Sequence, residues 1–235
     1  MLGVLVFTMV AIVEHPRPRG KATLWRGFAP VPMVIRDAGL LAVKPPALSV
    51  LLAALAFFLM ATNPVEVFWP SHAKPLLEAG HANTVIGAVT ATYFFSVALG
   101  AALSAPISRL FRRRHAVTLA AGFAGLAVLQ LALAMQGGIT GFVAVFILYS
   151  VILGLCDTPA STILHGCVDD HQRSTLLSLR SLVQQLGAAL GLVLAGAVAD
   201  ICSTPVAWSA GAGFLVIAVL LALILARRLA VETDG

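Results

Sequence analysis

The stretch LCDTPAS, residues 155–161, places an acidic residue and a proline inside a long apolar run. An ionised carboxylate is costly in hydrocarbon unless it meets a partner, water or an ion. Two kinds of chemistry would account for Asp157. It could exchange a proton or pair with a cationic solute, or it could form a hydrogen bond or ion pair within the protein, for instance with Arg180. The sequence leaves both interpretations open.

Other reactive side chains form weaker patterns. His165 and Asp170 form HxxxxD, which some acyltransferases use, but no soluble domain is present to hold an acyl donor. Cys156, His165, Cys167 and His171 match no zinc-binding spacing. The chain also lacks GxSxG, HExxH and P-loop motifs. We therefore predict no catalytic residues, no metal site and no cofactor, and a protein that is not an enzyme.

Composition indicates the solvent that surrounds these residues. The 235 residues are 60% hydrophobic and only 11% charged, whereas soluble domains carry about 25% charged residues. The chain is basic, with a pI near 9.6. Its basic residues, however, fall in short clusters between apolar runs, as in the loops of membrane proteins. The predicted partner is the lipid bilayer, and no nucleic acid is expected.

The apolar runs predict the elements that position the polar residues. A membrane-spanning helix needs about 20 mostly apolar residues. Six segments meet this requirement: 46–69, 84–108, 116–135, 141–165, 179–199 and about 206–226. Residues 1–13 resemble part of a further spanning helix, and residues 14–45 form a basic linker. The predicted fold class is an all-α integral membrane protein, with a six-helix bundle over residues 46–235 after the partial helix.

The loops predict the orientation in the membrane. Fourteen of the fifteen basic residues lie in alternate loops and in the C-terminal tail, and the opposite loops hold only Lys74. By the positive-inside rule, the basic loops and the C-terminus are cytoplasmic. The basic residues assigned to cytoplasmic loops include Arg109, Arg112, Arg113, Arg114 and Arg173.

Helical spacing sorts the segments by their faces. Segments 84–108, 141–165 and 179–199 carry polar or small stripes, whereas 116–135 and 206–226 look suited to lipid contact. The stripe residues predicted to line a solute or ion pathway are Tyr93, Ser150, Asp157 and Gln184.

Segment 46–69 is ambiguous. Asn63 and Glu66 are further pathway candidates near its outer end, next to Pro64, which should break or kink the helix and free a carbonyl. The alternative places Glu66 at the outer interface, with Trp69 as its aromatic-belt neighbour.

Small residues indicate close helix packing. Gly187 and Gly191 form GxxxG, which lets two helices approach closely. We assign Gly100, Gly154 and Pro159 to packing as well.

Two stretches carry a family resemblance. Residues 154–200 resemble the tenth and eleventh helices of major facilitator superfamily transporters, through Gly154, Pro159, Arg173 and the glycines Gly187 and Gly191. The cluster ISRLFRRRH, residues 107–115, looks like the basic loop between the eighth and ninth helices. The acidic residue that this loop has in the family is absent here. The resemblance covers nearly the whole chain, as the end of helix six, the central linker and helices seven to twelve.

The resemblance implies a function. In this family the substrate lies between two six-helix halves that rock about it. The chain would be the C-terminal half of a secondary transporter in the plasma or inner membrane. It would move a small molecule by alternating access, driven by an ion gradient, with proton antiport and efflux as the expected use. Its partner would be an N-terminal six-helix half, on the same or a separate chain. A membrane fragment or scaffold that transports nothing and a dimeric half-transporter remain alternatives.

Overall fold

The computed structural model describes residues 46–77, 81–111, 114–167 and 173–234, and every element in these ranges is helical. The predicted partial helix (1–13) and basic linker (14–45) lie outside the described residues. The elements are α4 (Pro46–Ala73), the short 3-10 helix η1 (Lys74–Leu76), α5 (Ala82–Leu110), α6 (His115–Ala134), α7 (Ile139–Gly166), α8 (Arg173–Ile201) and α9 (Thr204–Asp234).

All six α-helices in the described ranges are long enough to cross a membrane. They hold 20 to 31 residues, which at about 1.5 Å per residue exceeds or matches the roughly 30 Å of a hydrocarbon core. Their most apolar windows have mean hydropathies between 1.7 and 2.6. The prediction of an all-α fold with six membrane-length helices is therefore confirmed.

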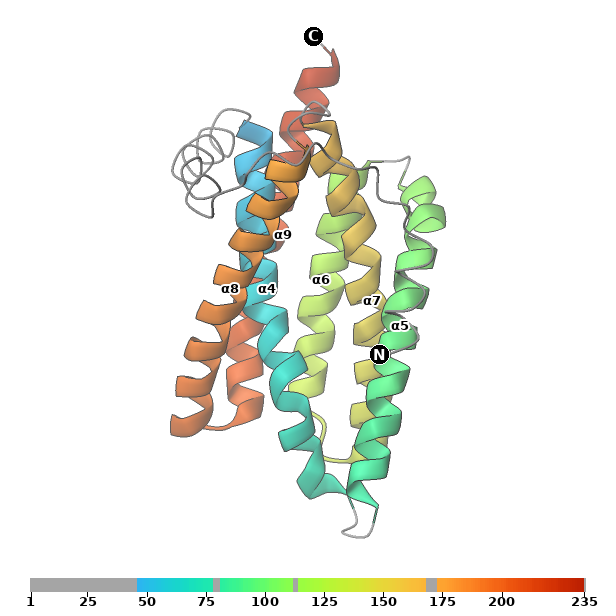
Figure 1. The fold of residues 1–235 in the computed structure, drawn as a ribbon, viewed down its shortest axis with the longest axis vertical. Helices are drawn as coiled ribbons and strands as arrows, with labels where there is room; N and C mark the ends of the chain where they lie inside the picture. Colours follow the sequence, from blue (N-terminus) through green and yellow to red (C-terminus); the bar gives the residue numbers. More distant parts are fainter. Residues whose placement is uncertain (1–45, 78–80, 112–113, 168–172, 235) are drawn as a thin grey trace, which may run out of the picture. The chain divides into compact units, whose positions relative to one another are not determined.

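Successive helices run in opposite directions (Figure 1). The end of α5, the start of α6, the start of α8 and the end of α9 lie together, and described arginines gather there: Arg109, Arg114, Arg173, Arg227 and Arg228. Lys74, in η1, lies at the opposite end. Arg112 and Arg113 lie outside the described residues. The alternating direction of the helices thus places these arginines at one end of the bundle and Lys74 at the other, as the assignment of loops from the sequence requires.

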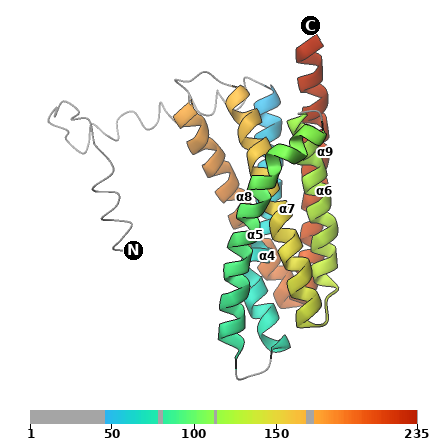
Figure 2. The same ribbon diagram turned by 90° about the vertical axis from the view of Figure 1, so that its right-hand side faces the viewer.

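The helices associate in close pairs. α5 packs along α7, α6 along α9, and α4 along both α8 and α9, while α6 also contacts α7. In Figure 2, where α5 faces the viewer, α7 lies beside it. Large, fully buried side chains at these contacts include Leu48, Leu51 and Leu55 of α4, Phe123 of α6, Phe142 and Phe146 of α7 and Trp208 of α9.

Glycines bring α5 and α7 into backbone contact. Gly100 of α5 lies against the Val151 carbonyl of α7, and Gly154 of α7 lies against the Val97 carbonyl of α5. A Cβ atom at either glycine would overlap backbone atoms, which cannot move aside as a side chain can. On α8, Gly187 and Gly191 lie in the same way against the carbonyls of Ala56 and Met60 of α4.

Prolines do not break these helices. The sequence predicted a break or kink at Pro64, and the break is absent, because α4 continues through Pro64 to Ala73. A proline leaves the carbonyl four residues earlier without its helical donor. In α7 Pro159 frees the Leu155 carbonyl, and the Ser104 hydroxyl of α5 donates to it at 3.1 Å. A neighbouring helix thus supplies the hydrogen-bond donor that the proline removes, and the loss of this donor would otherwise favour a break in the helix.

α6, which was predicted to suit lipid contact, is also packed within the bundle. In its most apolar window 56% of the residues are buried, as in α4, compared with 17% in α5 and 22% in α8. α6 packs between α7 and α9, whereas its Val128 and Leu131 are exposed. Hydropathy alone does not separate the two environments, because the interior of a membrane bundle is as apolar as lipid.

A buried glutamine joins four helices. Gln130 of α6 donates through Nε2 to the carbonyls of Trp208 at 2.9 Å and Ala61 at 3.3 Å. Its Oε1 accepts from the Tyr149 hydroxyl of α7 at 3.4 Å. The side chain is completely buried, so these bonds have no competition from water.

We expect Gln130→Leu to destabilise the bundle by about 1–2 kcal/mol, because it leaves the buried Tyr149 hydroxyl without its acceptor. The thermal midpoint of the purified protein in detergent measures this. The matched control is Gln185→Leu, at an exposed position on α8. Equal midpoints for Gln130→Leu and the control would show that the hydrogen bonds contribute nothing.

Candidate functional site

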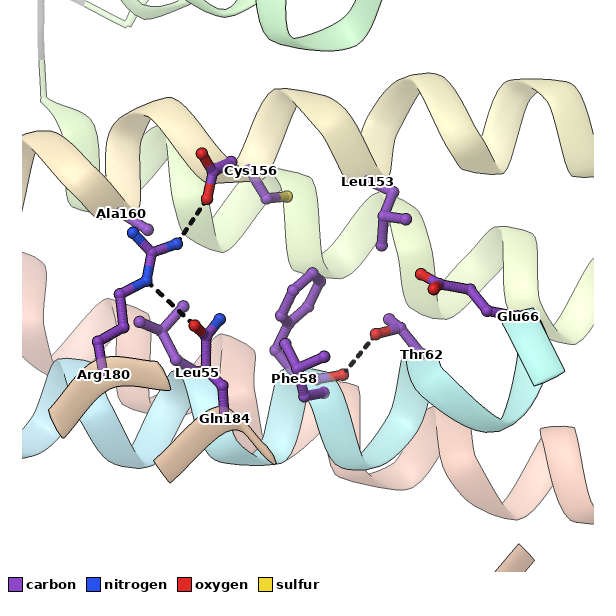
Figure 3. Close-up of a pocket in the computed structure, with 11 residues that line it drawn as sticks. Leu55, Phe58, Thr62, Glu66, Leu153, Cys156, Ala160, Arg180 and Gln184 are labelled. Atoms are coloured by element: carbon purple, nitrogen blue, oxygen red, sulfur yellow. Dashed lines mark hydrogen bonds and ion pairs between the residues drawn. The ribbon is translucent and has the colours of Figure 1, made fainter. Parts of the chain in front are cut away.

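A pocket lies between α4, α7 and α8 (Figure 3). Its volume is about 140 Å³, enough for a few water molecules but smaller than the roughly 300–1,000 Å³ of sites that enclose a drug-sized ligand. It is lined by Leu55, Phe58, Leu59, Thr62 and Glu66 of α4, by Leu153, Cys156, Asp157 and Ala160 of α7, and by Arg180 and Gln184 of α8.

The pocket arises from the way the helices pair. α4 packs on α8, and α5 packs on α7, whereas α4 and α7 make few direct contacts. The space between α4 and α7 is walled by apolar side chains, notably Phe58 and Leu153, with polar groups toward each end (Figure 3). An apolar wall with a few polar groups is typical of a solute-binding surface.

Arg180 is held by three partners at one end of the pocket. Its Nη2 donates to Oδ1 of Asp157 at 2.5 Å, its Nη1 to Oγ of Ser161 at 2.8 Å, and its Nε to Oε1 of Gln184 at 3.2 Å. The Arg180 side chain is 12% exposed and that of Asp157 is 67% exposed. Each nitrogen of the guanidinium is engaged, and Asp157 compensates its charge.

Asp157 therefore forms the ion pair with Arg180 that the sequence offered as one of its two interpretations. The pair joins α7 to α8. A role in proton coupling stays a prediction.

Glu66 lies at the other end of the same pocket, with Phe58 between it and Arg180 (Figure 3). The Tyr93 side chain of α5 lies near the Glu66 carboxylate. Among the described residues, no basic side chain lies within ion-pair distance of Glu66. It is thus an acid on a membrane-length helix, without a charge partner in the described part of the chain.

Glu66 lies well inside α4, among packed side chains. α4 continues seven residues beyond it, to Ala73. Trp69, which the alternative interpretation placed in an aromatic belt, is 5% exposed and packs on Phe146 with ring centroids 5.1 Å apart.

The structure brings together only some of the predicted pathway residues. Asp157, Glu66 and Gln184 line the pocket, whereas Tyr93 lies outside the lining, near Glu66. Ser150 is completely buried and donates to the Phe146 carbonyl at 2.7 Å, so it lies away from the pocket. Asn63 is half-buried and outside the lining.

Sequence reasoning missed the central place of Arg180. A signal was present, since Arg180 and Gln184 lie four residues apart on the same face of α8. Thr62 and Cys156 also line the pocket, but both hydrogen-bond to carbonyls four residues earlier in their own helices, those of Phe58 and Ile152. Thr62 lies one helical turn before Glu66, which was a sequence signal for its position, whereas Cys156 had no such signal.

Metal ligation finds no support in the described ranges, where no group of three His, Cys, Asp or Glu side chains comes together. Asp170 and His171, part of the motifs considered from sequence, lie outside these ranges.

Comparison with known families agrees with the fold. The model of the Major Facilitator Superfamily matches residues 50–234, which include all or most of each of the six helices. A search of curated proteins found no match to this chain. With this match over most of its length and six membrane-length helices, the chain belongs to the Major Facilitator Superfamily and is a multi-pass membrane transporter.

Proposed function

We propose that this chain is the C-terminal six-helix half of a secondary transporter that exports a small molecule by alternating access, driven by a proton gradient. The observation that carries the proposal is the pocket between α4, α7 and α8, which holds two carboxylates within membrane-length helices. Acidic residues in such helices commonly mark substrate paths or proton relays.

The size of the pocket supports the assignment of this chain to one six-helix half of a transporter. A volume of about 140 Å³ holds only part of a drug-sized molecule. A second six-helix half facing this pocket would complete the site, as expected for transporters whose substrate lies between two halves.

The distribution of charge supports the membrane orientation. Because the described arginines gather at the end of the bundle where α9 ends, we place that end and the C-terminus in the cytoplasm of a plasma or inner membrane.

Asp157 could couple transport to protons through its partner. When Asp157 is ionised it holds Arg180, and α7 is tied to α8. Protonation of Asp157 would remove the charge that holds the guanidinium and loosen this tie. An exchange between the two states would let a proton move with the conformational cycle.

A resistance assay in a drug-sensitive bacterial host tests the proposal. It compares the chain alone, the chain with an N-terminal six-helix half encoded upstream, and that pair carrying Asp157→Asn. We expect export only from the pair, and loss of gradient-driven export in Asp157→Asn. Asp200→Asn, an exposed acid at the end of α8 away from the pocket, is the matched control.

The other results discriminate the alternatives. Export by the chain alone would indicate a dimeric half-transporter. If no form exports any compound, the proposed function fails in favour of a membrane fragment or scaffold.

A further inference from the structure

We propose that the transported molecule is an organic cation with an apolar body, and that Glu66, rather than Asp157, binds its positive charge. This inference rests on the proposed function, because it takes the pocket to lie on the transport path.

The first argument is that the described lining of the pocket has no uncompensated positive charge to offer an anion. Among the described residues of the lining, Arg180 is the only basic one, and its three nitrogens already donate to Asp157, Ser161 and Gln184. An anionic solute would have to displace Asp157 from a charge-assisted hydrogen bond of 2.5 Å.

The second argument concerns the balance of charge. Glu66 and Asp157 carry two negative charges when ionised, and Arg180 carries one positive charge. The ion pair compensates Asp157, so the remaining charge belongs to Glu66. A bound cation would compensate that charge, which in an apolar setting is otherwise costly.

The third argument is that Glu66 has capacity to bind. An ionised carboxylate accepts about four hydrogen bonds, and the nearby Tyr93 occupies one of these sites at most. Tyr93 is itself held by stacking on Phe146, with ring centroids 5.7 Å apart. The carboxylate is thus able to meet an ammonium or guanidinium group.

The walls of the pocket indicate the rest of the molecule. Leu55, Phe58, Leu59 and Leu153 form an apolar surface between Glu66 and Arg180 (Figure 3). An apolar or aromatic body would lie on this surface while its charge meets Glu66. The class is therefore an amphipathic organic cation, and a small inorganic ion would leave this surface unused.

The test measures export of charge-matched probes from cells that carry the complete transporter. One pair is tetraphenylphosphonium and tetraphenylborate, which share shape and differ in the sign of charge. Benzyltrimethylammonium and its neutral analogue neopentylbenzene supply a smaller pair. We expect export of at least one cation and of neither the anion nor the neutral compound.

Variants then locate the charge site. Glu66→Gln should reduce cation export by about tenfold or more, because it removes the charge with little change in shape. Glu66→Asp, which keeps the charge, should retain part of the export. Arg180→Gln/Asp157→Asn, which removes both members of the ion pair, should keep the preference for cations in a binding assay, which needs no proton coupling. Asp200→Asn should match the wild type.

Three results would overturn the inference: export of anionic or neutral compounds in preference to cations, unchanged cation export in Glu66→Gln, or loss of the cation preference only when Asp157 is changed. In each case transport itself would persist, so the proposed function would stand. A complete transporter that exports nothing would instead remove the proposed function, and this inference with it.

Discussion

Replacing Gly100 with valine should leave little folded protein in the membrane. A side chain at this position would meet the Val151 carbonyl and the Leu155 nitrogen of α7, which are backbone atoms. The two helices would have to separate along their whole contact, and the reciprocal contact of Gly154 with Val97 would be lost as well. Packing is the main attraction between helices in lipid, because lipid tails are as apolar as the side chains. We expect a loss of about 3 kcal/mol or more.

The measurement is the yield of monodisperse protein by size-exclusion chromatography in detergent, followed by its thermal midpoint. Gly87→Val is the matched control on the same helix, since nothing lies within 4 Å of a Cβ atom at Gly87. It should behave as the wild type. Equal yields and midpoints for Gly100→Val and Gly87→Val would show that α5 and α7 do not approach as described.

Replacing Arg180 with glutamine should reduce transport by about tenfold or more, at equal protein levels. The change removes the donors to Asp157 and Ser161 and leaves Asp157 as a second uncompensated acid in the pocket. The effect on stability should be smaller than the roughly 3–5 kcal/mol of a broken, fully buried pair, because Asp157 is 67% exposed. The substitution should therefore lower the transport rate more than it lowers the stability of the protein.

A double variant separates charge balance from other effects. Arg180→Gln/Asp157→Asn restores electrical neutrality and should recover substrate binding, while gradient-driven export stays lost because Asp157 is proposed to carry the proton. Arg228→Gln, an exposed arginine near the end of α9, serves as the control for a lost positive charge. Wild-type transport by Arg180→Gln would mean that the pair is a surface contact with no role in the cycle.

The helices could be predicted from sequence because the bilayer fixes their length. The predicted segment 141–165 and the observed α7, Ile139–Gly166, differ by two residues at the start and one at the end. A predicted segment is too short where polar residues continue the helix. α8, for example, begins at Arg173 instead of residue 179. Hydropathy locates the apolar part of a helix, whereas hydrogen bonding decides where the helix ends.

The site was only partly predictable. Spacing placed Asp157 and Arg180 on polar faces of their helices, and the sequence named their pairing as one possibility. Periodicity gives the residues of a face but not the neighbour that the face meets. Ser150 shares a stripe with Asp157, yet it is buried while Asp157 is exposed to the pocket. Similarly, Gln130 is a lone polar residue in an apolar segment, and only the packing of four helices reveals its role.

The central claim is that the pocket between α4, α7 and α8 lies on the transport path, and protection of a cysteine by substrate tests it most directly. The protein carries Leu59→Cys, with Cys156 and Cys167 replaced by serine and the exposed Cys202 kept as an internal reference. A small thiol reagent is applied in lipid nanodiscs with and without an exported compound, and labelling of each cysteine is read by mass spectrometry. We predict that the compound slows labelling at position 59 and leaves Cys202 unchanged. Unchanged labelling at position 59, in a protein that still exports the compound, would contradict the account.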